Sequence, residues 1–441
     1  MISTALSSIA AVVAVAALAY LIVVAAAAVA GAMARGGRRE RAVDAYEALA
    51  VSRFTIPVSI IVPVDGPCAA LSPSVAALLS SNYPELEVIV VADSLSFAAL
   101  EGLKRDWSLE PKELFFRRTL ESAPVRRIFT SERDARLVVV EKDPAGRADA
   151  FNCGVSLARF RYVVSAPHDV MCDPDALLRL MAPALRDPGA VLAVTSYVER
   201  NAQGSPAPTN SAAGDYQRLA SIRSWMASRL GWQQMECGLP PRDGVSAWRR
   251  DAVLELGGLS VNAPDAELDL LIRLQTSHAA NATGRIVRTS EVFGHAPALT
   301  IPAASRVAGR RRRAVFYAFQ TYRALPGGTP ARVMMLSVLG LELLTPAAQG
   351  IAAAVILAST AAGWVSWYAP LLLLLMLAFG YGLMSASALL LRGGSPGAPS
   401  GSDLTRLLWR APLELAVYRP ALIWARFMSV AAPRKQAMER S

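Results

Sequence analysis

The sequence predicts an α/β domain with a mostly parallel sheet, held between hydrophobic segments of the membrane type. Of the 441 residues, 53% are hydrophobic, and these residues gather at the two ends of the chain. The middle alternates short runs of β-branched residues with helical stretches, which is typical of a parallel sheet covered by helices on both faces. The length suits one such domain plus membrane segments.

The first apolar segment, residues 1–34, carries no charge, and its core runs from Ile9 to Ala32. A membrane crossing needs about 20 apolar residues, so this segment is predicted to be an N-terminal transmembrane helix. A cleaved signal peptide is the alternative, but it would carry positive charge before the apolar run. The arginines come after it, in a linker at 35–53, and the positive-inside rule therefore places the following domain in the cytoplasm.

The second apolar block runs from Val333 to Leu391 and contains only one charged residue, Glu342. Within the unit 326–392 we expect an interfacial helix at Val333–Leu344 and two spans, near Ala347–Trp367 and Leu371–Leu391. Residues 393–441 are predicted to form a cytoplasmic linker and an amphipathic, interfacial tail. The chain is thus expected to be a multi-pass protein of the inner (plasma) membrane.

The middle domain is predicted to span residues 54–325. Its expected strands are Val58–Pro63, Leu86–Val91, Leu137–Val140 and Tyr162–Ser165, with helices at Ser74–Ser80 and Ala148–Ala158 between them. In open parallel sheets, ligands bind beyond the carboxyl ends of the strands. The polar residues that follow these strands are Asp65, Asp93, the loop Pro144–Asn152 and the segment Pro167–Asp169.

This set of polar residues suits a nucleoside diphosphate. Carboxylates such as Asp93 and Asp169 can accept hydrogen bonds from a base or ribose, or bind a hard cation on a diphosphate. Arg147 lies in a glycine-containing loop, where it can meet diphosphate oxygens. The alternative is that each aspartate only forms a turn or caps a helix.

The net charge of +10 raises nucleic-acid binding as an alternative function, and the apolar segments raise transport. Nucleic-acid binding is disfavoured because the basic residues flank apolar segments and do not interleave with aromatic ones. A transporter is disfavoured because only three candidate spans surround a large polar middle, whereas transporters usually repeat their span sets.

Five segments, in chain order, resemble the family-2 glycosyltransferases with a GT-A fold. These segments are Val58–Pro63, Asn82–Asp93, Gly146–Asn152, Arg249–Gly258 and Glu267–Leu274. The likeness is greatest to membrane-bound synthases of the cellulose, hyaluronan and poly-N-acetylglucosamine type.

The resemblance implies inverting transfer from a UDP-sugar to a lipid or saccharide acceptor, with Mg²⁺ or Mn²⁺ as cofactor. It also implies a role in cell-surface polysaccharide or glycolipid synthesis, alongside partner proteins of that synthesis. It assigns Glu267 as the catalytic base and Asp169 as the metal ligand. The implied nucleotide-sugar-binding residues are Pro63, Asp65, Asp93, Arg147, Asn152 and His168, and the implied acceptor-side residues are Asp243, Gly244 and Arg312.

Several positions depart from the family pattern. Pro167-His168-Asp169 stands where the family has Asp-x-Asp, and Ala266-Glu267 stands at the catalytic Glu-Asp pair. The family's Gln-x-x-Arg-Trp motif is replaced by Gly309–Arg313, which favours non-processive transfer over polymer synthesis. The arginine run can also be read as a solvated basic face near the membrane. A pseudo-glycosyltransferase that acts as a scaffold in a polysaccharide-synthesis complex is the alternative function.

Overall fold

The computed structural model describes residues 55–65, 70–93, 95–113, 116–201, 212–230, 244–279, 284–322, 354–355, 357–364, 366–392 and 401–431. The predicted transmembrane helix at 1–34 and the basic linker at 35–53 lie outside these ranges.

Four parallel strands form the centre of the sheet, in the order β5-β2-β1-β6. They are β1 (Val58–Val64), β2 (Leu86–Ala92), β5 (Leu137–Lys142) and β6 (Tyr162–Ser165). Every residue of β1 and β2 is buried, as expected of strands that are covered on both faces. The four strands predicted from the sequence are confirmed.

The sheet continues on both sides of this centre and reaches ten strands in the order β3-β4-β5-β2-β1-β6-β9-β8-β10-β7. The added strands are β3 (Leu109–Pro111), β4 (Val125–Ser131), β7 (Met171–Cys172), β8 (Val191–Asn201), β9 (Gly244–Arg249) and β10 (Arg285–Pro297). β9 runs antiparallel to both β6 and β8, and β4 runs antiparallel to β5. β10 pairs with β8 in parallel, so the sheet has two parallel parts that are joined by the antiparallel β9 and flanked by antiparallel strands. The prediction of a mostly parallel sheet is therefore confirmed only for these two parts, and the sheet as a whole is mixed.

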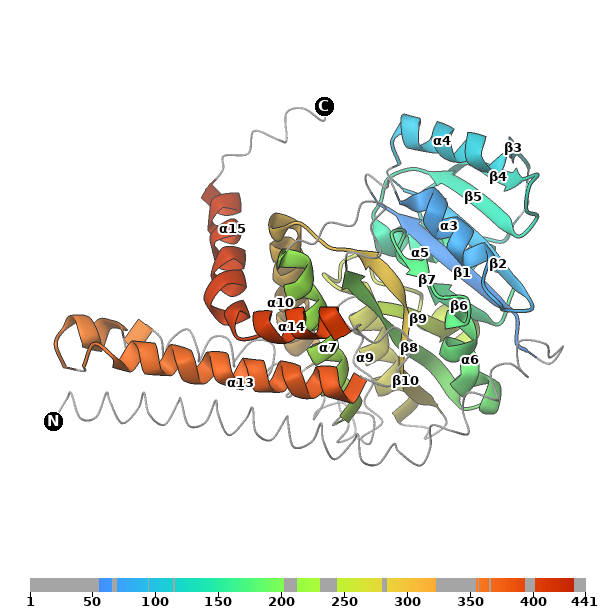
Figure 1. Ribbon diagram of the computed structural model, residues 1–441. Helices are drawn as coiled ribbons and strands as arrows, with labels where there is room; N and C mark the ends of the chain where they lie inside the picture. Colours follow the sequence, from blue (N-terminus) through green and yellow to red (C-terminus); the bar gives the residue numbers. More distant parts are fainter. Residues whose placement is uncertain are drawn as a thin grey trace.

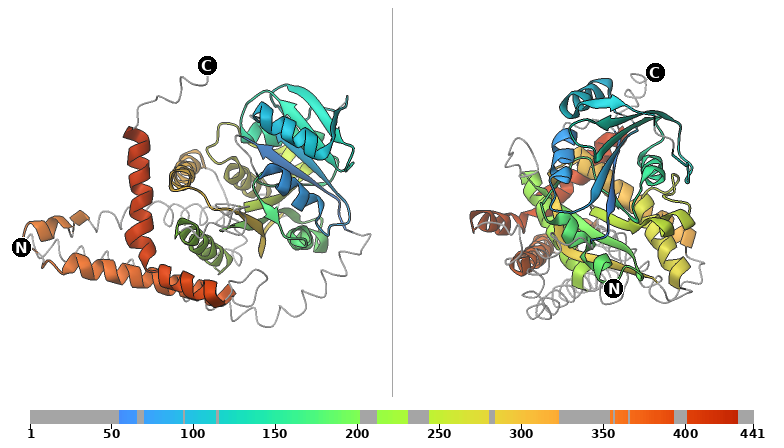
Figure 2. Two further views of the ribbon diagram at one scale, coloured as in Figure 1. Left: turned by 45° about the horizontal axis from the view of Figure 1, so that its top comes forward. Right: turned by 90° about the vertical axis from the view of Figure 1, so that its right-hand side faces the viewer.

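Helices cover both faces of the sheet (Figures 1 and 2). One hydrophobic core joins the sheet to α3 (Leu71–Leu79), α4 (Phe97–Trp107) and α6 (Ala176–Arg186). A second core on the other face holds α5 (Arg147–Leu157), α8 (Arg250–Glu255) and α9 (Ala266–Ala279). The two cores fix the strand ends, and with them the loops that carry the polar residues.

A third group of helices packs beyond the end of β8. It comprises α7 (Ala212–Leu230), α10 (Ile301–Tyr322), α13 (Ala369–Arg392), α14 (Gly401–Arg410), the π-helical turn η3 (Glu414–Tyr418) and α15 (Arg419–Ala431). A separate hydrophobic cluster joins Tyr197 of β8 and Tyr216 of α7 to Leu389, Leu407 and Tyr418. The predicted amphipathic tail thus forms helices that bury one face on the domain and expose Trp409 and Trp424 on the other.

The predicted membrane crossings are not confirmed. Within the described residues, no helix combines the length and the apolarity that crossing a bilayer requires. α13 coincides with the expected span near Leu371–Leu391, whereas the span near Ala347–Trp367 is described only in part. The interfacial helix expected at Val333–Leu344 lies outside the described residues.

Candidate functional site

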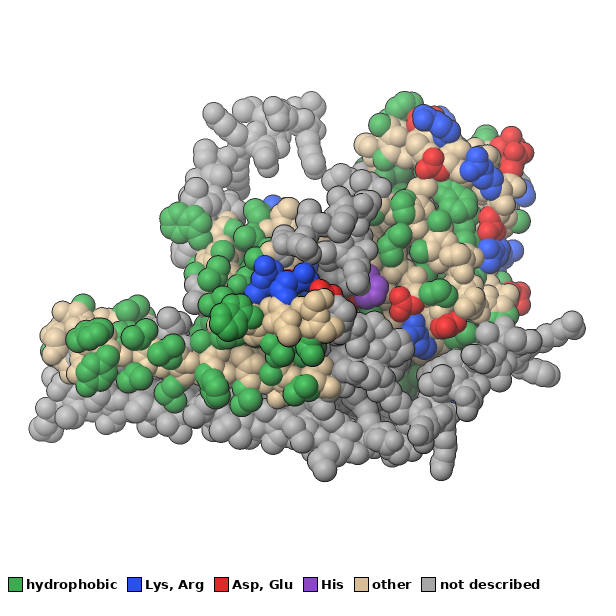
Figure 3. Space-filling model, in the orientation of Figure 1, with side chains coloured by type: hydrophobic (Ala, Val, Ile, Leu, Met, Phe, Trp, Pro, Cys, Tyr) green, Lys and Arg blue, Asp and Glu red, His purple; other side chains and the backbone are tan. Residues whose placement is uncertain are grey.

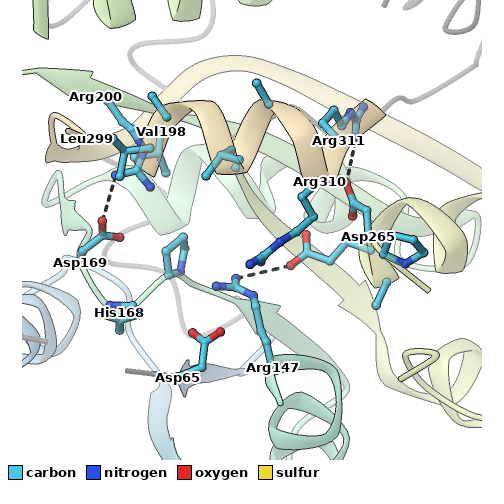
Figure 4. Close-up of a pocket in the computed structure, with 18 of the residues that line it drawn as sticks. Asp65, Arg147, His168, Asp169, Val198, Arg200, Asp265, Leu299, Arg310 and Arg311 are labelled. Atoms are coloured by element: carbon cyan, nitrogen blue, oxygen red, sulfur yellow. Dashed lines mark hydrogen bonds and ion pairs between the residues drawn. The ribbon is translucent and has the colours of Figure 1, made fainter. Parts of the chain in front are cut away.

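A cavity of about 930 Å³ opens at the carboxyl ends of the parallel strands. Its strand side is formed by Asp65 after β1, Arg147 at the start of α5, and His168 and Asp169 after β6. Its helical side is formed by α10, η3 and α15, and Glu267 enters from the first turn of α9. Figure 4 shows Asp65, Arg147, His168 and Asp169 facing the same space. The cavity therefore lies at the edge of the sheet where the sequence predicts a ligand site.

Glu267 is held at the cavity wall by two strand residues. Ser165 of β6 donates a hydrogen bond of 2.8 Å to Oε1, and Ser246 of β9 donates one of 3.3 Å to Oε2. Burial raises the pKa of Glu267, and this effect outweighs the opposing influence of nearby Arg147 and of the two serines. A carboxylate with a raised pKa is a better proton acceptor, which is the property that a general base needs.

Arg147 lies opposite Glu267, with Nη2 at 3.7 Å from Oε1. It follows Gly146, whose φ of 97° lies in the left-handed region that glycine adopts readily. Gly146, Arg147 and Ala148 all line the cavity at the start of α5, where free backbone N–H groups favour an anion. This end of the cavity is therefore suited to phosphate oxygens.

Asp93 has a different place from the one predicted. It is buried, does not line the cavity, and accepts hydrogen bonds from the backbone N–H groups of Ala145 and Gly146, at 2.9 and 2.8 Å. Lys142 bridges it to Asp149. Burial would raise the pKa of Asp93, but the hydrogen bonds from Lys142 and this backbone outweigh burial and lower it. Its carboxylate thus holds the loop before Arg147 in place.

Asn152 and Pro63 also lie outside the cavity lining. Asn152 is buried and clamps Leu259, donating to its carbonyl at 2.9 Å and accepting from its N–H at 2.8 Å. The neighbouring Gly258 leaves room for this clamp, because a Cβ there would lie 2.5 Å from Asn152 Oδ1. Pro63 is buried within β1. These two residues do not face the cavity; they stabilise the strand and the loop that lie next to it.

Asp169 forms an ion pair with Arg200 at the end of β8. Arg200 Nη1 lies 2.9 Å from Asp169 Oδ2 and also donates to the carbonyl of Pro297 at 3.0 Å. Burial would raise the pKa of Asp169, but the Arg200 charge outweighs it and lowers the pKa. Arg200 was not foreseen, because it lies 31 residues after Asp169 in a segment without a recognisable motif.

His168 lines the cavity beside Asp169, and its buried Nδ1 atom finds no hydrogen-bond partner among the described residues. Burial lowers its pKa, which favours the neutral imidazole. A neutral ring with one open nitrogen can bind a polar ligand group.

The residues around Asp169 do not fit a resident divalent cation. Mg²⁺ and similar ions require several oxygen ligands, supplied by carboxylates and by the substrate. Here one oxygen of Asp169 is bonded to a guanidinium, and the described residues contain no group of three His, Cys, Asp or Glu side chains arranged to hold a metal. The predicted metal-ligand role of Asp169 thus has no supporting donor set.

The arginine run on α10 meets the cavity through Arg310 and Arg311, whereas Arg312 does not line it. The period of 3.6 residues turns Arg312 about 100° away from Arg311. Arg311 pairs with Asp265 at 2.8 Å, and Arg310 extends from α10 toward Arg147 (Figure 4). Of the other acceptor-side residues, Gly244 lines the cavity and Asp243 lies outside the described residues.

The helical side of the cavity is largely apolar. Its lining includes Tyr197, Leu299, Val307, Tyr418 and Leu422. Tyr418 stacks on Tyr216 with ring centroids 5.3 Å apart. These residues were missed because they come from segments that are distant in sequence, and because Tyr418 and Leu422 belong to the tail that was expected to lie at a membrane surface. Only the amphipathic pattern of the tail could have indicated that one face would pack on the domain.

Comparison with solved structures finds similar proteins over most of the chain. A mannosyltransferase from Pyrobaculum calidifontis, solved in complex with GDP-Man and Mn²⁺, matches with a TM-score of 0.52 and 18% identity, covering 89% of this chain and 99% of that one. Two further matches have lower TM-scores. S. aureus TarS gives 0.36 at 12% identity, covering 77% of this chain and 92% of that one. Glucosyl-3-phosphoglycerate synthase from Mycobacterium tuberculosis, in complex with phosphoglyceric acid, gives 0.35 at 17% identity, covering 62% and 82%.

No family model and no curated protein sequence matches this chain. The narrower resemblance, to membrane-bound family-2 synthases, stays a prediction. The match to the mannosyltransferase establishes the architecture: the chain has a mixed α/β fold with a large sheet, of the GT-A-like glycosyltransferase type.

Proposed function

We propose that this protein is a glycosyltransferase that moves one sugar from a nucleoside-diphosphate sugar to an acceptor hydroxyl, with inversion. The observation that carries the proposal is the facing pair of Glu267 and Arg147 in one cavity at the carboxyl ends of the parallel strands. A carboxylate base with a raised pKa and a guanidinium are the two groups that such a displacement needs, one for the incoming hydroxyl and one for the leaving diphosphate.

In this reaction Glu267 takes the proton from the acceptor hydroxyl. The hydroxyl oxygen then forms a bond to the anomeric carbon, and the bond from that carbon to the diphosphate oxygen breaks. The diphosphate leaves with the electron pair, and its developing charge is met by Arg147 and the start of α5. A single displacement from the opposite face inverts the anomeric configuration.

The donor is proposed to be a UDP-sugar, as in the family that the sequence resembles, with Asp65 and His168 as polar contacts. Both residues line the cavity on its strand side. Asp93 is assigned to positioning the Arg147 loop, since its two oxygens already accept backbone N–H groups. Gly309–Arg313 replaces the polymer-binding motif, so transfer is proposed to be non-processive.

The acceptor is proposed to be lipid-linked. The apolar side chains that β8, α10, η3 and α15 contribute to the cavity suit a hydrophobic acceptor better than a free saccharide. Large exposed apolar residues also lie on α13, which does not line the cavity, and their exposed fractions run from 45% to 71%: Leu371, Leu372, Leu375, Met376, Phe379, Leu383 and Leu390. Figure 3 shows hydrophobic side chains along this helix.

Membrane attachment, with the catalytic domain on the cytoplasmic side of the inner membrane, is part of the proposal. Contiguous apolar surface of this kind is rare on proteins that meet only water. A flotation assay with phospholipid vesicles tests it. Phe379→Asp combined with Leu375→Asp should weaken binding, and Phe97→Asp, at an equally exposed position on α4, should not. Equal flotation of both variants would contradict the proposed membrane face.

The activity is tested by incubating the detergent-purified full chain with UDP-glucose, UDP-N-acetylglucosamine and GDP-mannose and measuring release of the nucleoside diphosphate. Release from at least one donor, accelerated by membrane lipid extract, is the expected result. No release from any donor, together with no nucleotide binding, would contradict the enzymatic proposal and favour a scaffold in a polysaccharide-synthesis complex.

A further inference from the structure

We infer that arginine side chains, and not a divalent cation, neutralise the leaving diphosphate, with Arg200 occupying the position of a cation against Asp169. This inference rests on the glycosyl transfer proposed above. It extends that proposal by naming the groups that replace the Mg²⁺ or Mn²⁺ implied by the resemblance.

The first support is the way Arg200 is fixed. Its guanidinium bonds both the Asp169 carboxylate and the Pro297 carbonyl, and its side chain is only 11% exposed. A cation approaching this carboxylate would have to separate the pair and leave a largely buried guanidinium without its counter-charge. Breaking such a pair from one side is costly, which favours the guanidinium over the metal.

The second support is the number of guanidinium groups that reach the cavity. Arg147 comes from the strand side and Arg310 from α10, and Figure 4 shows the two side chains extending toward each other in the cavity. Arg200 and Arg311 also line the cavity, and each is paired with an aspartate, Asp169 and Asp265 respectively. Arg147, Arg200 and Arg310 therefore bring guanidinium groups to the cavity from three elements, and Arg200 shares its charge with Asp169.

The third support is chemical. A guanidinium presents a planar fork of N–H donors that matches two phosphate oxygens at once. Three such groups, with the backbone N–H groups at the start of α5, can meet the oxygens of a diphosphate from several directions. No step of the transfer then requires a Lewis acid.

Calorimetric titration of the full chain with UDP and GDP, in EDTA and in Mn²⁺, tests the inference. The expected result is binding of one of them in EDTA, with an affinity within about threefold of that in Mn²⁺. Arg200→Gln should weaken this binding about tenfold or more in EDTA, as expected for loss of a charge-assisted contact. Mn²⁺ should restore part of the loss, because the substitution frees Asp169.

Two variants control the test. Arg179→Gln removes a matched pair, since Arg179 is 10% exposed and lies 3.0 Å from Asp173 outside the cavity, and it should leave binding unchanged. Asp169→Asn should retain binding in EDTA within a few-fold. If Arg200→Gln does not fold, this second variant still decides when it is titrated in Mn²⁺ as well, because a site that depends on a metal held by Asp169 would lose its nucleotide there.

Binding that appears only with Mn²⁺ or Mg²⁺, and that Asp169→Asn abolishes, would overturn the inference and leave the proposed function standing. Absence of UDP and GDP binding under every condition would overturn the proposed function, and the inference with it.

Discussion

On the strand side of the cavity, Lys142 of β5 bridges Asp93, which lies 49 residues earlier in the chain, to Asp149 of α5. On the helical side, Arg223 of α7 pairs with Glu414, which lies 191 residues later in the chain. Both clusters are buried ion pairs. The first fixes the loop before Arg147, which faces the proposed diphosphate. The second fixes η3 and α15, which supply Tyr418 and Leu422 to the apolar wall.

The two sides of the cavity therefore depend on different parts of the chain. The strand side belongs to the sheet and its two cores, so it should persist as long as the domain is folded. The helical side depends on docking of residues 401–431, and it should loosen when that docking is weakened. Donor binding and acceptor binding should therefore respond to different substitutions.

The largest effect is expected from Glu267→Gln, at the point where the two sides meet. Removing a general base should lower the transfer rate about 10³-fold while UDP or GDP still binds, because the diphosphate is held by other residues. Rate measurements and calorimetry on the same preparation check this. Glu255→Gln, at an exposed position on α8, is the control; an equal loss in both variants would contradict the assignment.

The next effect is expected on the helical side. Arg223→Met removes the bonds to Glu414 and to Ser385 Oγ and should destabilise docking of the tail by about 3 kcal/mol, as for other buried pairs broken from one side. Hydrogen exchange should rise across residues 401–431 and stay unchanged in β1 and β2. Arg126→Met, whose pair with Asp143 is solvent-exposed, should change little. Unchanged hydrogen exchange in the tail would contradict the dependence of its docking on the Arg223–Glu414 pair.

A smaller effect is expected on the strand side from Asp93→Asn. The substitution should cost about 2 kcal/mol of folding free energy, since Lys142 retains Asp149 as a partner. Because the pKa of Asp93 is lowered in the folded protein, its contribution is present above the unfolded-state pKa of about 3.9 and is lost as the pH falls through the folded-state value. Urea unfolding at neutral and acidic pH checks this; a difference from wild type that grows toward acid would contradict it.

The smallest effect is a shift of the pH profile. Ser165 stabilises the charged form of Glu267, so Ser165→Ala should raise the pKa of the base further. The base works when deprotonated, and the acidic limb of the rate profile should therefore move upward by about one pH unit. Ser246→Ala removes the longer hydrogen bond, of 3.3 Å, and should shift the limb less. A downward shift in either variant would contradict Glu267 as the base.

The sequence was sufficient for the centre of the fold. The Val- and Ile-rich runs predicted β1, β2, β5 and β6, and the polar residues after them predicted the edge where the cavity lies. Arg147, Asp169 and Glu267 were found because each follows a strand or opens a helix in a recognisable motif. The remaining strands were missed because their pattern is short or irregular and their pairing is set by tertiary contacts.

Local sequence patterns could not predict which residues these side chains contact in the folded protein. Asp93 looked like a ligand group because its carboxylate follows a strand, but its backbone donors and Lys142 become visible only in the folded loop. Arg200 is brought to Asp169 by the antiparallel insertion of β9, which sequence reasoning did not foresee. The rotation of α10 about its axis determines that Arg310 lines the cavity and Arg312 does not. A run of four arginines gives no hydrophobic pattern from which that rotation could be predicted.

Inverting transfer through Glu267, without a divalent cation, is the reaction that we propose for this cavity. Proton NMR of the sugar transferred from an α-linked donor, with the full chain in detergent and EDTA, tests it most directly. We expect a β-linked product, formed by the wild type and reduced about 10³-fold in Glu267→Gln. An α-linked product, or transfer that occurs only after Mn²⁺ is added, would contradict it.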